Sequence, residues 1–150
     1  MNHTIKNELK NKLIKYGDFE SLSSVVLDTS NIFNVENIKQ QSIDLIVNFG
    51  ITNNIRRVNK FHECINKKIN NDKIYISCAE TLEERRIRVR NKSFFGFKNI
   101  IRFVDFSFKR LLPKLPVFKK IYFLMTQGRN RVMSKTEILG RLISCGFEII

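Results

Sequence analysis

The chain has 150 residues, of which 43% are hydrophobic and 27% charged, so it suits one domain with a real core and excludes fibrous, collagenous and fully disordered proteins. The formal net charge of +13 predicts an anionic partner. Three widely spaced cysteines predict neither a disulfide framework nor a zinc site. The longest apolar run, residues 121–125, is far too short to span a bilayer, and residues 1–16 are too polar for a secretory signal. We therefore expect a cytoplasmic protein.

Short strands and amphipathic helices alternate along the first half of the chain. Ile5, Leu9 and Leu13 recur every four residues and predict a helix over residues 4–16. A longer apolar stripe, broken by the polar residues 70–72, predicts a second helix over residues 53–69. Three short apolar, β-branched runs are typical of buried parallel strands: residues 24–28, 43–48 and 73–79.

The positive charge is concentrated in residues 81–133. This segment holds 14 Lys and Arg residues against three Asp and Glu, and it also holds eight of the 13 phenylalanines. It opens on a Thr81-x-x-Glu84 capping box. Residues 97–112 place their apolar side chains on one half of a helical wheel, and two prolines end that helix before a second basic, aromatic helix over residues 117–126. The segment 82–133 is thus predicted to be a basic helical hairpin inserted in the domain.

The C-terminal part predicts one more helix and a strand. Ser134 is an N-cap with Glu137 at the third position, the helix runs through Leu142, and Gly146 fits a left-handed C-terminal cap before a strand over residues 147–150. Alternation of continuous apolar strands with helices predicts an α/β fold with a mostly parallel sheet, folded as a single domain over residues 1–150.

This layout resembles the later half of a class I methyltransferase-like Rossmann fold, in the runs VVLD, IDLIVN, KIYIS and SKTEILGRLISCGFEII. Only 23 residues precede the first strand, which leaves no room for the strand, Gly-rich turn and helix that would hold S-adenosylmethionine. We therefore expect an incomplete Rossmann-like domain without a cofactor. Asp28 ends a strand where a ribose could be bound, but a turn-capping role is favoured.

A closer resemblance covers residues 44–150. The strings NNIRRVNKF, AET with the following RR, KRLLPKL, GRNRVMS, LGRL and CGFE resemble the N-terminal part of a bacterial sugar transferase family of exopolysaccharide biosynthesis. The resemblance implies enzymes that move a sugar-1-phosphate from a nucleotide sugar to a polyprenyl phosphate at the membrane. The basic and acidic motifs of their catalytic domain have no counterpart in this chain. We therefore expect no transferase activity from it alone, and a role as an accessory region to a separate or downstream catalytic domain.

The amphipathic, basic segment predicts contact with an anionic membrane surface or a polyprenyl phosphate. A helix with one apolar and one cationic half can lie in a bilayer interface, although it could instead bury its apolar half on the sheet. Given the family resemblance we favour the membrane, with the protein peripheral to the inner membrane. The predicted contact residues are Lys98, Arg102, Lys109, Arg110, Lys114, Lys119 and Lys120.

The remaining polar residues give weaker predictions. Arg129 and Arg131 could bind a phosphate or simply be solvated. Glu80 follows the third strand at the edge where α/β sheets bind ligands, but a capping role is favoured for it. His62 and Cys64 point in different directions on one helix, so both are expected to pack in the core rather than form a catalytic pair. No metal site is predicted. The alternatives are a degenerate methyltransferase-like protein and a nucleic-acid-binding domain, which lacks any recognised nucleic-acid motif.

Overall fold

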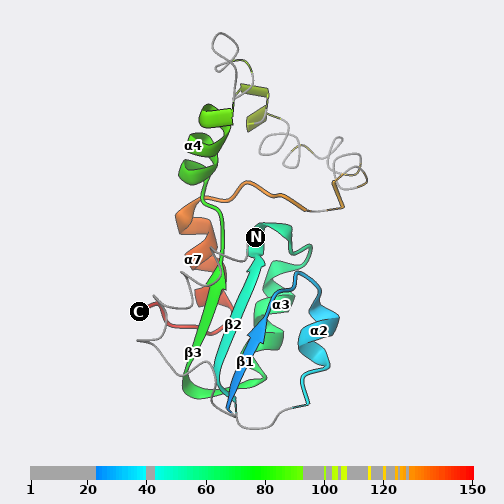
Figure 1. The fold of residues 1–150 in the computed structure, drawn as a ribbon, viewed down its shortest axis with the longest axis vertical. Coiled ribbons are helices and arrows are strands. Elements are labelled where there is room, and N and C mark those ends of the chain that lie inside the picture. Colours follow the sequence, from blue (N-terminus) through cyan, green and yellow to red (C-terminus); the bar gives the residue numbers. More distant parts are fainter. Residues whose placement is uncertain are drawn as a thin grey trace.

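A three-stranded parallel sheet organises the chain. The computed structural model describes residues 23–39, 43–92 and 129–150, together with ten single residues between 100 and 127. The strands are β1 (Ser24–Leu27), β2 (Ile43–Ile51) and β3 (Ile69–Cys78), arranged in the order β1-β2-β3 (Figure 1). Val26 pairs with Val47, and Val47 pairs with Ile76. The prediction of an α/β fold with a parallel sheet is confirmed.

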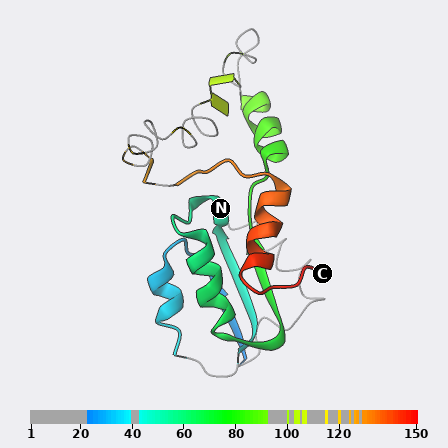
Figure 2. The same ribbon diagram turned by 180° about the vertical axis from the view of Figure 1, so that it is seen from behind.

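Helices connect the strands as parallel pairing requires. α2 (Ile32–Glu36) lies between β1 and β2, while a 3₁₀ turn, η2 (Thr52–Asn54), and α3 (Val58–Asn66) lie between β2 and β3. In the described ranges 43–92 and 129–150, the helices α4 (Leu82–Lys92) and α7 (Lys135–Ser144) follow the sheet in sequence. Figure 2 shows α2, α3 and α7 on one face of the sheet, while α4 projects away from the strand ends.

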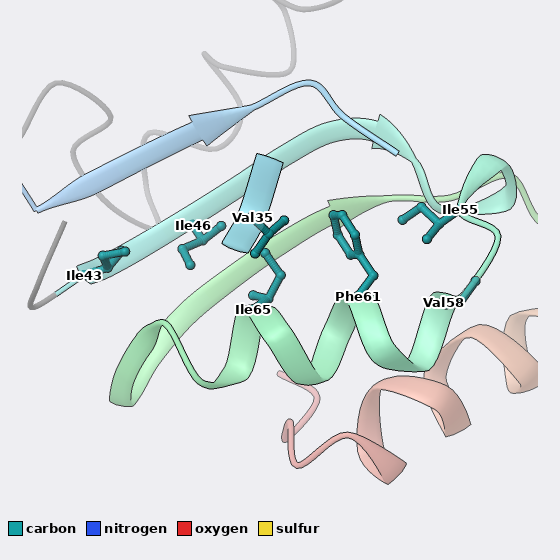
Figure 3. Packing of buried hydrophobic residues seen from close by; sticks show 7 residues of the cluster. All are labelled: Val35, Ile43, Ile46, Ile55, Val58, Phe61 and Ile65. Atoms are coloured by element: carbon teal, nitrogen blue, oxygen red, sulfur yellow. The ribbon is translucent and has the colours of Figure 1, made fainter. Parts of the chain in front are cut away.

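The main core lies between β2, α2 and α3. Phe61 and Ile65 rise from α3 toward the sheet, where they meet Ile43, Ile46 and the α2 residue Val35 (Figure 3). On the opposite face of β2, Leu45, Val47 and Phe49 are buried against residues of β3. Because β2 is buried on both faces, its sequence is a continuous apolar run instead of an alternating one.

Several predicted boundaries were wrong. The helix predicted over residues 53–69 is shorter, because Asn53 lies in the 3₁₀ turn and Ile55 is extended, so α3 begins only at Val58. Residues 70–72 lie within β3, which starts at Ile69, at a point where the pairing register with β2 shifts and Asp72 takes a φ of +59°. The short helix α2 was not predicted. The helix predicted over residues 4–16 lies outside the described residues.

The predicted helix caps are confirmed. Thr81 and Glu84 form the capping box, with the Thr81 amide donating to Glu84 Oε2 at 2.7 Å and the Glu84 amide donating to Thr81 Oγ1 at 3.3 Å. The Thr81 hydroxyl also donates to Glu84 Oε2, at 2.9 Å, and the amide and hydroxyl of Thr81 together hold the pKa of the Glu84 carboxyl below its usual value. Ser134 Oγ accepts from the Glu137 amide at 3.2 Å and so caps α7.

The strand predicted over residues 147–150 is absent. Gly146 has a φ of +86°, and the amides of Gly146 and Phe147 donate to the carbonyls of Ile143 and Leu142. This Schellman motif folds the chain back over the end of α7. The Phe147 ring then packs on Tyr75, with ring centroids 5.2 Å apart, instead of continuing as a strand.

The segment between α4 and α7 leaves and rejoins the domain at one place. Thr81 forms a parallel bridge with Met133, and the Leu82 amide donates to the Met133 carbonyl at 2.9 Å. Among the residues between, Ile100, Phe103, Val104 and Phe106 are helical, as are Lys120, Leu124 and Thr126. The rest of the predicted hairpin lies outside the described residues.

His62 is a core residue, as predicted, and only 1% of it is exposed. Its Nδ1 lies 3.4 Å from the hydroxyl of Tyr75, and its ring meets that of Phe61 edge to face. Burial, with a smaller contribution from the positive charge of Arg141, lowers the pKa of His62 to about 4. The folded protein therefore keeps this ring neutral at neutral pH.

The buried His62 should make the domain acid-sensitive. Between pH 6.5 and about 4 the unfolded chain binds a proton at His62 that the folded chain does not, so stability is full above this window and falls as the pH is lowered through it. We expect the free energy of unfolding, measured by urea titration, to drop by about 2 kcal/mol between pH 7 and pH 5 from this group. The variant His62→Gln should be less stable at pH 7 but should lose this part of the pH dependence. An equal drop in both proteins would contradict the assignment.

Candidate functional site

The loops that follow the three strands meet at the carboxyl edge of the sheet. Asn48, fully buried near the end of β2, joins the first two of them. Its Oδ1 accepts from the amides of Thr29 and Gly50, and its Nδ2 donates to the Thr29 carbonyl, each at 3.0 Å. One side chain thus fixes the end of β1 to the end of β2, which positions the residues that follow both strands.

Asn53 is the second organising residue of this edge. Its Nδ2 donates to the carbonyls of Glu80 and Arg131, at 2.9 and 2.7 Å, and its Oδ1 accepts from the Glu80 amide at 2.7 Å. The Arg131 amide donates in turn to the Asn53 carbonyl at 3.0 Å. The side chain of Asn53 is therefore hydrogen-bonded to both the loop after β3 and the loop before α7.

Glu80 is held by two arginines of α4. Its carboxylate accepts from Arg88 at 2.5 and 2.8 Å in a bidentate pair, and from Arg85 at 3.5 Å. Arg85 is only 4% exposed and also donates to Asn130 Oδ1 at 2.6 Å. The carboxylate that the sequence offers at the ligand edge is thus an ion-pair partner that anchors the start of α4.

A groove of about 720 Å³ lies beside this network, at the ends of β1 and β2. Ser30 and Asn31 line it from the loop after β1, and Asn54 and Arg56 line it from the loop after β2. Lys120, Leu124, Gln127 and Arg129 complete its lining. Open α/β sheets bind ligands at this carboxyl edge, so the groove lies where the fold favours a site.

The electrostatics of the groove are one-sided. Arg56, Lys120 and Arg129 are all exposed, and within the described part of the chain none of them forms an ion pair with a carboxylate. No Asp or Glu lines the groove among the described residues. Three positive charges with no compensating acid create a local field that attracts anions.

The structure separates the two arginines that the sequence proposes for phosphate contact. Arg129 lines the groove, whereas the Arg131 guanidinium donates to the Arg56 carbonyl and so supports the groove from behind. Asp28 lies exposed after β1 and is not part of the lining. Of the seven cations predicted to contact a membrane, Lys120 is described and lines the groove, while Lys98, Arg102, Lys109, Arg110, Lys114 and Lys119 lie outside the described residues.

The cysteines offer no reactive thiolate. Burial raises the pKa of all three thiols, and the nearby Asp28 carboxylate raises that of Cys78 further. Cys145 is buried, and its thiol lies 3.5 Å from the Asn59 carbonyl. In the residues that the structure describes, no group of three or more His, Cys, Asp or Glu side chains is placed to hold a metal ion.

Comparison with known proteins finds no match: no family model, no curated protein and no solved structure is significantly similar to this chain. None of the helices in the described part of the chain has the length and apolar character that a membrane crossing requires. The chemistry of the site must therefore be inferred from its own residues.

Sequence reasoning missed most of the residues that build this edge. Asn48 and Asn53 are ordinary polar residues in the sequence, and their partners lie 19, 27 and 78 residues away. The available signal was a cluster of Asn and Thr directly after the most apolar strand, since a polar residue that is buried there must be hydrogen-bonded. Arg56 belongs to the string NNIRRVNKF, which resembles a known family, but the sequence assigns no binding role to it.

Proposed function

We propose that this domain is a non-catalytic accessory region that docks on the anionic cytoplasmic face of the inner membrane. Its contact surface is the basic, aromatic segment 82–133, arranged as a helical hairpin on an incomplete, methyltransferase-like Rossmann domain. On the resemblance noted above, its partner is a catalytic sugar transferase domain of exopolysaccharide biosynthesis that acts on a polyprenyl phosphate. The proposal rests first on the exposure of apolar side chains in this segment.

Apolar side chains of the segment face solvent. Among the described residues between 93 and 128, five large apolar side chains are exposed, with Phe103 at 71% and Leu124 at 81%; the others are Ile100, Val104 and Leu115. A helix that packed its apolar half on the sheet would hide such groups. Exposed apolar groups that alternate with cations along the chain are typical of an interfacial segment.

The charge of the segment supports the same surface. Arg86 and Arg90 lie exposed on α4, which projects from the carboxyl edge of the sheet (Figure 1). Arg85 and Arg88 on the same helix are held in ion pairs with Glu80, so Arg86 and Arg90 are the α4 arginines placed to meet an anionic surface. Each cation near such a surface contributes on the order of 1 kcal/mol.

Vesicle sedimentation tests the docking surface. Phe103→Ser should weaken partition onto phosphatidylcholine vesicles containing phosphatidylglycerol by about tenfold, because a phenylalanine side chain leaves the interface. Arg86→Gln combined with Arg90→Gln should weaken it by a further factor of about 30 and reduce its salt dependence. The matched controls are Phe33→Ser, which removes a 62% exposed ring from α2, and Lys60→Gln on α3 combined with Lys67→Gln at the C-cap of that helix.

The outcome also separates the rival functions. Equal loss of vesicle binding in the variants and in their controls would contradict the docking surface. Salt-sensitive binding to single-stranded DNA with no retention on vesicles would favour the nucleic-acid alternative. Saturable binding of S-adenosylmethionine in calorimetry would favour the degenerate methyltransferase.

A further inference from the structure

The groove at the ends of β1 and β2 collects cations from three separate parts of the chain. Arg56 follows η2, Arg129 precedes α7, and Lys120 belongs to the segment between α4 and α7. Residues so far apart in sequence share one groove only because the fold brings them there. Helical periodicity, which spreads cations along an exposed face, does not account for this arrangement.

The neighbouring arginines show that these three are different. Arg85 and Arg88 are bound by Glu80, and the Arg131 guanidinium is bound by the Arg56 carbonyl. Arg56 and Arg129 have no such partner among the described residues, and Arg56 contributes to the network only through its backbone. Their guanidinium groups are therefore available to a ligand.

The groove also holds neutral hydrogen-bond donors. Asn54 Oδ1 accepts from the Asn130 amide at 3.0 Å, and no described residue accepts from its Nδ2. Asn31 likewise uses its Oδ1, which accepts from the Phe33 amide at 3.1 Å, while its Nδ2 and the hydroxyl of Ser30 have no acceptor among the described residues. Donors and cations without a carboxylate suit a ligand rich in acceptor oxygens.

A second cavity of the same region lacks this character. It measures about 650 Å³ and lies between the end of β3 and α7. Its lining includes Glu83 and Glu84 against one cation, Lys135, together with apolar residues of α7. Both cavities lie in the same highly basic protein, so the unbalanced positive lining of the first groove is a local property and not a consequence of the net charge.

We propose that the groove lined by Arg56, Lys120 and Arg129 binds the phosphate or diphosphate group of a phosphate ester. Guanidinium groups bind phosphate oxygens in bidentate pairs, and three cations match the two or three negative charges of a phosphate monoester or diphosphate. A volume of about 720 Å³ exceeds what a phosphate fills and lies in the range of small-molecule sites. The rest of the ester would lie against Ser30, Asn31 and Asn54.

Calorimetry with inorganic pyrophosphate and with glycerol 3-phosphate tests the groove on the full chain. We expect saturable binding that falls by tenfold or more in Arg56→Gln and again in Arg129→Gln. Arg56→Gln leaves the contact with Arg131 in place, because that contact uses the backbone carbonyl. The matched control is Arg57→Gln, which removes an exposed arginine next in sequence that does not line the groove.

The phosphate could belong to a free ester or to a lipid headgroup, and the experiment distinguishes these two sources. Binding of both soluble probes that depends on Arg56 and Arg129 supports a free ester. No soluble binding, but retention on phosphatidic acid vesicles that depends on the same two residues, supports the groove with a lipid headgroup as its ligand. Equal losses in Arg57→Gln and Arg56→Gln, or no dependence on either residue in any arm, would overturn the proposal. Phe103→Ser should leave pyrophosphate binding unchanged, so failure of the docking surface and failure of the groove are distinguishable.

Discussion

Gly50→Ala should strongly destabilise the domain. A Cβ built at Gly50 would lie 2.6 Å from the Thr29 carbonyl carbon and 2.7 Å from the Thr29 nitrogen, and it would also overlap the Thr29 oxygen. These are backbone atoms, so no side-chain rotation relieves the overlap. The loop after β1 would have to move away from β2, which also breaks the hydrogen bonds between Asn48 and Thr29.

The expected cost is about 3 kcal/mol or more, since overpacking alone costs 1–3 kcal/mol and the lost Asn48 bonds add to it. The measurement is urea unfolding followed by circular dichroism. Gly140→Ala is the matched control, because a Cβ at Gly140 meets nothing within 4 Å and alanine favours the helix α7. The control should be more stable than the parent by up to about 1 kcal/mol. A Gly50→Ala protein as stable as the parent would show that β1 and β2 are not held in this register.

Asn53→Leu should loosen the loops at the carboxyl edge of the sheet while the strands stay paired. The substitution leaves the Glu80 amide and the carbonyls of Glu80 and Arg131 without their partner. An unsatisfied buried backbone group costs about 1–3 kcal/mol, so we expect a loss of about 3 kcal/mol in the free energy of unfolding. The loop before α7 should then be held less firmly to the loop after β2, because only the bonds from the Arg131 amide, the Arg131 guanidinium and the Asn130 amide remain, and phosphate binding in the groove should weaken with it.

Hydrogen exchange gives the most direct readout of this change. The Glu80 amide, which donates to Asn53 at 2.7 Å, should exchange much faster in Asn53→Leu, while amides in the centre of β2 should stay protected. The neighbouring variant Asn54→Ala is the control, because Asn54 accepts only one described hydrogen bond, from Asn130. It should cost about 1 kcal/mol and leave the Glu80 amide protected. Unchanged exchange at Glu80 in Asn53→Leu would contradict the organising role of Asn53.

The elements of the fold that depend on neighbouring residues in the sequence could be predicted. The buried run of β2, the capping box at Thr81 and the Ser134 cap are signals within a few residues, and the structure contains all three. The strand expected after Gly146 failed because the packing of Phe147 on Tyr75, more than 70 residues away, decides the path of the chain. Local propensity does not contain that contact.

The candidate site was predictable only in outline. Composition located the positive charge between residues 81 and 133, and the carboxyl edge of the sheet was the expected place for a ligand. The actual set, Arg56 with Lys120 and Arg129, joins residues from three separate parts of the chain and therefore follows from the tertiary fold. Likewise, the sequence offers Glu80 either as a ligand-binding carboxylate or as a cap, and only the position of α4 shows that Arg88 binds it.

The bridge between Thr81 and Met133 makes the residues between them an insertion whose two ends are paired with each other. The chain departs and returns at neighbouring positions, so lengthening or shortening the interior of this segment adds mainly a change in loop-closure entropy, which grows slowly with length. The strands keep their pairing, while Lys120 and Leu124 of this segment line the groove beside them. Evolution can therefore replace the segment between Thr81 and Met133 with a different one, and so change what the domain binds, without changing the residues of the core.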